Sequence, residues 1–147
     1  MKRLFLYYSL TGNCEAVAAR YAGAGWDVCR VESAERLPKR FFFRVLQGGF
    51  LAGIGHKSKL LPLEKDPAEY DEIVVCSPIW NARLCCPISS LLDDERLRGR
   101  KISFVFCSGS GEGPKAAQKI AKLFPAAAVS FLKEPREHPA ELDKLVF

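Results

Sequence analysis

The sequence lacks the features that mark several common protein classes. No stretch approaches the 18 or more consecutive apolar residues of a membrane span. Residues 4–10 already include Tyr and Ser, so the opening is too short and too polar for a signal-peptide core. We find no internal repeat and no low-complexity segment. With 48% hydrophobic and 27% charged residues in 147, we expect one globular domain over residues 1–147, in the cytoplasm and without membrane insertion.

The chain has only a small excess of positive charge. The net charge of +5 is too small to indicate a nucleic-acid-binding protein. The densest basic segment is 36–44, which contains Arg36, Lys39, Arg40 and Arg44. This segment is either the solvated face of a helix or a docking surface for an acidic protein partner.

Metal-ligand spacing is also missing. The six cysteines form no Cys-x-x-Cys pair, and the two histidines are far apart in the sequence. A structural zinc site is therefore not expected, and the cysteines are predicted to be free thiols, several of them in the core. A strained disulfide between the adjacent Cys85 and Cys86 is the alternative.

What the chain does contain is an alternation of short apolar runs and helix-like segments. This pattern predicts a parallel β-sheet of five strands covered by helices on both faces. The expected strands are 3–8, 26–31, 73–76, 101–107 and 127–132. The expected helices are 12–22, 37–52, 84–92, 114–124 and 135–146.

In such sheets a ligand binds outside the carboxyl ends of the strands, where the strand order reverses. The relevant loops, 9–13, 77–82 and 108–113, are rich in hydroxyl, amide or glycine residues. The first leads directly into a helix, whose free N–H groups and dipole form an anion site. It contains no Lys or Arg, so neutral donors would hold a phosphate. A helix cap without a ligand remains the alternative.

The other two loops offer different chemistry. Trp80 could stack on a flat ring system, or could simply pack against a helix. Three glycines between residues 109 and 113 would let the backbone approach a ligand closely, or would form only a flexible turn.

Several enzyme and switch classes are excluded by these loops. The strand ends lack the acidic residues of a response-regulator receiver. No G-x-G-x-x-G follows the first strand, and neither histidine lies near a candidate nucleophile in the sequence.

Taken together, the loops resemble those of flavodoxin and its bacterial relatives. The residues that carry the resemblance are 8–13, 71–80 and 107–111, and the segment 48–71 is similar to a stretch of short flavodoxin-like proteins from anaerobic bacteria. The resemblance implies a flavodoxin-like three-layer α/β sandwich, with the parallel strands in the order 2-1-3-4-5 and helices on both faces.

The resemblance also implies an FMN site. The 5′-phosphate would lie on the first loop, the isoalloxazine ring on Trp80, and backbone groups of the second and third loops on either side of the ring. The implied cofactor-binding residues are Ser9, Leu10, Thr11, Gly12, Asn13, Ser77, Pro78, Ile79, Trp80, Asn81, Ala82, Cys107, Ser108, Gly109, Ser110 and Gly111. No catalytic side chain and no metal ligand is assigned.

Three functions follow as expectations. The first is an electron-transfer flavoprotein that passes electrons between redox partner proteins. The second is an FMN-dependent NAD(P)H:quinone-type reductase, favoured because the third loop has no aromatic residue to shield the outer flavin face. The third is a flavodoxin-like binding module without flavin.

Overall fold

The computed structural model describes residues 1–34 and 57–147. The predicted helix 37–52 and the basic segment 36–44 lie outside the described residues. The strands are β1 (Arg3–Tyr7), β2 (Asp27–Arg30), β3 (Glu72–Trp80), β4 (Arg83–Leu84), β5 (Lys101–Ser108) and β6 (Ala128–Lys133). The α-helices are α1 (Asn13–Gly23), α3 (Cys86–Leu91) and α4 (Pro114–Leu123), and 3₁₀ helices span Pro67–Glu69, Glu95–Leu97 and Pro139–Lys144.

The strands form one sheet in the order β2-β1-β3-β5-β6, and these five strands run parallel to one another. The predicted class, a parallel sheet with helices on both faces, is confirmed. The predicted order 2-1-3-4-5 is not exact, because it omits β4. This two-residue strand pairs with the end of β3 in antiparallel fashion and lies off the main path of the sheet.

The central strand β3 is longer than the sequence predicts. We expected a strand over 73–76 followed by a loop, but β3 continues to Trp80. Pairing with β1 ends at Cys76, pairing with β5 continues to Pro78, and the last two residues pair with β4. Most of the expected second loop is therefore the projecting end of a strand.

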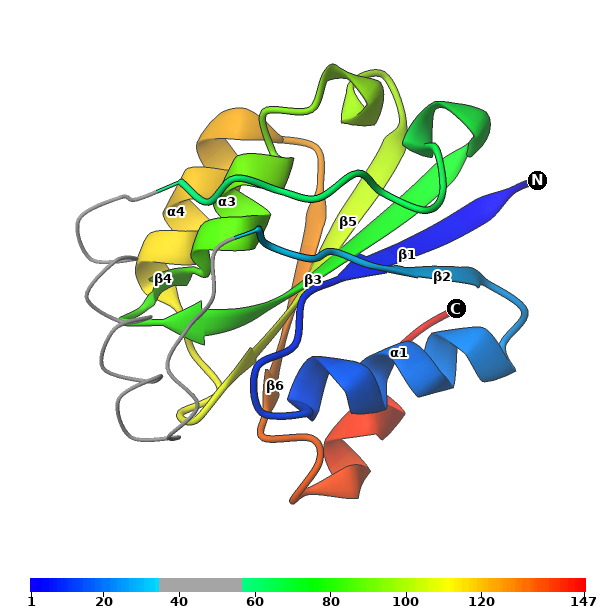
Figure 1. The fold of residues 1–147 in the computed structure, drawn as a ribbon. Helices are drawn as coiled ribbons and strands as arrows, with labels where there is room; N and C mark the ends of the chain where they lie inside the picture. Colours follow the sequence, from blue (N-terminus) through cyan, green and yellow to red (C-terminus); the bar gives the residue numbers. More distant parts are fainter. Residues whose placement is uncertain (35–56) are drawn as a thin grey trace.

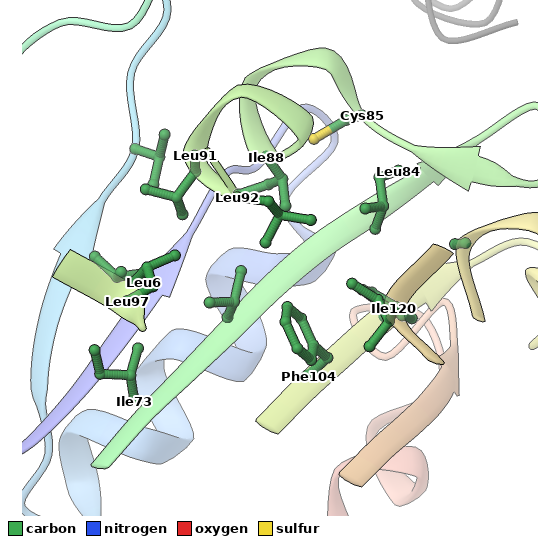
Figure 2. Packing of buried hydrophobic residues seen from close by; sticks show 14 of the residues in the cluster. Leu6, Ile73, Leu84, Cys85, Ile88, Leu91, Leu92, Leu97, Phe104 and Ile120 are labelled. Carbon is green, nitrogen blue, oxygen red and sulfur yellow. The ribbon is translucent and has the colours of Figure 1, made fainter. Parts of the chain in front are cut away.

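Each face of the sheet has its own apolar core. On one face α3 and α4 cover Leu6, Ile73 and Phe104, which are fully or almost fully buried; Figure 2 shows this packing, with Ile88, Leu91 and Ile120 facing the sheet. On the other face α1 and the C-terminal 3₁₀ helix cover a second set of side chains, comprising Phe5, Val74, Val105 and Leu132. Figure 1 shows these two helical layers on opposite sides of the strands.

The C-terminal segment differs from its prediction. An α-helix was expected over 135–146, but the structure has a 3₁₀ helix, Pro139–Lys144, with Leu142 as its buried residue. With a single buried side chain, the segment has little apolar surface to hold a longer helix against the sheet. In the ranges 1–34 and 57–147, no helix is both long and apolar enough to cross a bilayer.

Candidate functional site

A cavity of about 240 Å³ lies at the carboxyl ends of β1, β3 and β5. The structure brings all three predicted loops to it. Nine predicted site residues line this cavity, and Glu134 is the tenth lining residue. The nine are Leu10, Thr11, Asn13, Pro78, Ile79, Trp80, Cys107, Ser108 and Gly109.

The first loop leaves the amino end of α1 open. Gly12 precedes α1 with a φ of 94°, and no side chain caps the helix by a hydrogen bond. The Gly12 amide instead donates to Ser9 Oγ at 3.1 Å, and Asn13 Nδ2 donates to Thr11 Oγ1 at 3.2 Å. The uncapped N–H groups of the first turn and the positive end of the helix dipole are thus available to an anion.

Two arginines contact this loop, although none occurs within it. Arg136 Nη1 donates to the carbonyl oxygen of Thr11 at 2.7 Å, and the Arg136 amide donates to Asn13 Oδ1 at 3.1 Å. A Cβ at Gly12 would meet Arg136 Nη1 at 3.1 Å, so the guanidinium lies against this glycine. Arg30 Nη2 donates to the Ser9 carbonyl at 3.1 Å. The loop that we expected to hold an anion with neutral donors alone thus has two guanidinium groups against it.

A tight turn joins β3 to β4 at the next part of the site. Asn81 and Ala82 both have positive φ angles, 52° and 60°. Such a pair of angles is typical of the two-residue turns that close β-hairpins, although an alanine rarely adopts them. The Ala82 carbonyl accepts a hydrogen bond from the Ala116 amide of α4 at 3.1 Å, which fixes the turn against that helix.

Trp80 lies at the base of this turn. Its side chain is only 9% exposed and meets Tyr8 edge to face, with ring centroids 5.8 Å apart. The residue thus belongs to the core and borders the cavity at the same time. The packing that we gave as one interpretation of this tryptophan is present, and its stacking on a flat ring system stays a prediction.

The third loop contributes a buried hydroxyl group. Ser108 Oγ has no hydrogen-bond partner within residues 1–34 and 57–147, although it belongs to a cavity-lining residue. The Ser108 carbonyl accepts from the Glu134 amide at 3.1 Å, and Glu134 has a φ of 40°. This strained glutamate places a carboxylate beside the cavity. Glu134 is not among the site residues that we predicted from the sequence.

Seven of the predicted site residues do not line the cavity. Ser77 is fully buried, and its hydroxyl donates to the Pro78 carbonyl at 2.8 Å and contacts Cys85 Sγ at 3.3 Å. Ser110 is exposed and accepts from the Glu112 amide at 3.2 Å. The other five are Ser9, Gly12, Asn81, Ala82 and Gly111, which shape the backbone of the three segments.

All six cysteines are buried and take part in no disulfide, as the sequence predicts for the thiols, and Cys85 and Cys86 are not joined. Burial raises the pKa of the Cys85 thiol to about 12. Cys14, Cys76 and Cys107 lie close to one another, and Cys107 also lines the cavity. Hydrogen bonds from Cys14 and Cys76 lower the pKa of Cys107, whereas burial raises the pKa of the other two thiols.

A larger cavity, of about 610 Å³, lies at the opposite edge of the sheet. It is lined by the residues that precede β5 and β6, with an apolar floor that includes Leu97 and Phe124 and a basic rim that includes Arg98 and Lys122. None of the predicted site residues lies there. Ligands of parallel sheets bind at the carboxyl ends of the strands, so we take the smaller cavity as the candidate site.

No protein-family model and no curated protein sequence matches the chain. The fold, in contrast, is shared with solved structures. A flavoprotein from Lactobacillus acidophilus, crystallised in complex with FMN, is 20% identical with a TM-score of 0.72, covering 95% of this chain and 97% of its own. A candidate flavoprotein from Bacteroides eggerthii is 19% identical with a TM-score of 0.76, covering 97% of this chain and 96% of its own.

A third, more distant structure is that of a protein named as a flavodoxin. A WrbA-like flavodoxin of Agrobacterium tumefaciens is 12% identical with a TM-score of 0.51, covering 86% of this chain and 74% of its own. These similarities agree with the resemblance that the loop residues carry. The chain therefore has the flavodoxin-like fold of these flavoproteins.

Proposed function

We propose that the chain binds FMN at the 240 Å³ cavity and acts as an electron-transfer flavoprotein. The observation that carries this proposal is the hydroxyl of Ser108, which has no partner in the part of the chain that the structure describes and is buried in a residue at a cavity lined by all three predicted loops. A buried polar atom without a partner is rare in proteins and costs free energy. A ligand with polar atoms on its edge, such as the isoalloxazine ring, would satisfy it.

The phosphate of FMN would lie on residues 9–13. The uncapped first turn of α1 offers N–H groups, Gly12 has the backbone angle that such a close approach needs, and Arg136 adds a guanidinium beside that glycine. A guanidinium suits a phosphate because its N–H groups match the phosphate oxygens. We infer that the phosphate is bound by the helix end and by Arg136 together.

The isoalloxazine ring would occupy the apolar part of the cavity, between Trp80 and the loop 107–111. FMN, when bound, supplies the transfer of one or two electrons at this ring. Trp80 and Ile79 would provide an apolar wall that excludes water from one side of it. The Asn81–Ala82 turn would present a backbone carbonyl at the ring edge, since positive φ angles orient its peptide groups differently from those of a strand.

A second candidate function is reduction of a quinone-type acceptor with NAD(P)H. Among the described residues that line the cavity, Trp80 is the only aromatic one. One face of a bound flavin would thus be left for an acceptor or a second cofactor. As a carrier, the protein would instead meet redox partner proteins there. The basic segment 36–44, which we predicted as a docking surface for an acidic partner, is outside the described residues.

Fluorescence titration of the apo-protein tests the proposal. FMN is expected to bind tightly with quenching of its emission, and riboflavin, which lacks the phosphate, should bind much more weakly. Binding of neither flavin would leave a flavodoxin-like binding module without cofactor. Steady-state assays of the loaded protein then separate the two oxidoreductase functions, because turnover of NAD(P)H with a quinone is expected only of the reductase.

A further inference from the structure

Three buried thiols converge behind the candidate flavin site. Cys14 is in the first turn of α1, Cys76 is on β3, and Cys107 is on β5. Their exposed fractions are 1%, 0% and 3%. The three Sγ atoms all lie within 4.8 Å of one another. Cys29, Cys85 and Cys86 are not part of this group.

The topology of the sheet accounts for this convergence. Cys76 pairs with Val105 and Pro78 pairs with Cys107, so Cys76 and Cys107 occupy the same face of neighbouring parallel strands, offset by two residues. Helix α1 covers this face and contributes Cys14 from above. The three thiols are thus held by three separate elements rather than by one flexible loop.

A disulfide between the two strand cysteines does not fit this register. A strand spacing of about 4.8 Å and a rise of about 3.3 Å per residue separate their Cα atoms by about 8 Å. Disulfides require Cα atoms within about 7 Å of each other. Both thiol groups are therefore available to bind a metal ion.

We propose that Cys14, Cys76 and Cys107 form a binding site for Cu(I). Thiolate sulfur is a soft ligand that selects Cu(I) and zinc among the common metals. Structural zinc takes four protein ligands, but the cluster has three members and no fourth histidine, cysteine or carboxylate among residues 1–34 and 57–147. Cu(I) accepts coordination by three thiolates, so the number and type of ligands fit this ion.

The geometry requires only small movements. At the 4.8 Å limit, the centre of the sulfur triangle is about 2.8 Å from each Sγ. Inward shifts of about 0.5 Å would reach metal–thiolate distances of about 2.3 Å. Each thiol that binds releases one proton, and the amino end of α1, where Cys14 lies, favours the resulting negative charge.

An entry route exists because Cys107 also lines the 240 Å³ cavity. An ion that enters this cavity from solvent meets Cys107 first and then the two thiols behind it. The Cu(I) site does not depend on FMN, so the test uses apo-protein and its failure leaves the flavin proposal untouched.

The experiment is an anaerobic competition for Cu(I) between the reduced apo-protein and the chromophoric chelator bicinchoninate. Wild-type protein is expected to take up one Cu(I) per chain. The control variant C29A/C85A/C86A, which keeps only the three clustered cysteines, should bind with an affinity within about threefold of wild type. The variant C14A/C76A/C107A, which keeps only the other three, should bind at least about 100-fold more weakly because the thiolate ligands are gone.

X-ray absorption of the control variant loaded with Cu(I) gives a second measurement, which does not require the cluster variant to fold. A shell of three sulfurs at about 2.3 Å is expected. The proposal is overturned if the shell contains fewer sulfurs, if C14A/C76A/C107A binds as tightly as wild type, or if the control variant loses its Cu(I).

Discussion

Arg136 donates a hydrogen bond of 2.7 Å to the carbonyl oxygen of Thr11, a residue 125 positions earlier in the chain. Through this contact a guanidinium group lies beside the amino end of α1, where the sequence alone offers no cation. The carbonyl takes only part of the donor capacity of a guanidinium, which has five N–H groups. The remaining donors are available to an anion on the loop.

Replacing Arg136 should therefore separate phosphate binding from ring binding. Arg136→Leu is expected to lower FMN affinity by about 1.5–3 kcal/mol, since a hydrogen bond to a charged group is lost, and to leave riboflavin affinity unchanged. Parallel titrations with the two flavins measure this. Arg20→Leu, which removes an exposed arginine paired with Asp143, is the matched control and should change neither affinity. An equal loss for both flavins in Arg136→Leu would place the phosphate elsewhere.

Ser108→Ala should stabilise the apo-protein while weakening flavin binding. The variant removes a buried hydroxyl that has no partner, so the free energy of unfolding should rise by up to about 1 kcal/mol. Affinity for both FMN and riboflavin should fall by about 1 kcal/mol, because the lost hydrogen bond is to the ring. Urea unfolding and flavin titration give the two values.

The control for that experiment is Ser90→Ala in α3. Ser90 Oγ is also buried without a partner among the described residues, but Ser90 does not line the cavity. Its removal should leave both flavin affinities as they are. If the two serine variants behave alike toward flavin, Ser108 does not contact the ring.

Ala82→Gly should stabilise the protein although it removes a side chain. Ala82 has a φ of 60°, and an L-residue in this conformation is strained by about 1–2 kcal/mol relative to glycine. The greater freedom of glycine in the unfolded chain offsets about 0.4–1 kcal/mol of this. We expect a net gain of about 0.5–1 kcal/mol in urea unfolding. The same change at the exposed helical Ala22 should instead cost about 1 kcal/mol. Destabilisation by both substitutions would contradict the strain assigned to the turn.

The ionisation of Tyr70 should lower the free energy of unfolding at alkaline pH. Burial, together with a hydrogen bond of 2.7 Å from the Tyr70 hydroxyl to Asp27 Oδ2, raises the pKa of Tyr70 from 10.0 to about 12. The folded state thus keeps a proton that the unfolded chain releases. The stabilisation is fully present below pH 10 and is lost as the pH rises toward 12.

Tyr70→Phe tests this directly. At pH 8 the variant should be less stable by about 1.5–3 kcal/mol, the net value of a hydrogen bond to a charged group. The difference from wild type should shrink as the pH is raised from 10 to 12, as followed by urea unfolding at each pH. A difference that stays constant over this range would show that Tyr70 does not titrate between the two states.

The fold and the place of the candidate cavity could be predicted because they depend on local patterns. Apolar runs of strand length give the order of elements, and polar loops that follow strands identify the edge at which a ligand binds. Thr11 and Asn13 were found in this way. Both are at the cavity because the first strand lies in the middle of the sheet, where the strand order reverses.

The missed features depend on tertiary contacts. Glu134 and Arg136 follow β6, an edge strand whose loop we did not consider, although its carboxyl end lies next to that of β5. Cys14, Cys76 and Cys107 are far apart in the sequence, so spacing rules for metal ligands could not reveal them. The third strand was predicted to end at Cys76, but β3 continues through Pro78, which is tolerated where β3 passes beyond its β1 partner.

The projecting end of β3 limits the sequence changes by which this site could acquire a different ligand specificity. One wall of the cavity consists of paired strand residues, Pro78 to Trp80, whose register is fixed by β5 and β4. An inserted residue there would turn the following side chains to the opposite face of the sheet. The segment 109–113 has no such partners among the strands, so lengthening it leaves the register intact. New specificities, whether selected in nature or in the laboratory, should therefore arise by insertions after β5 and by single substitutions in β3.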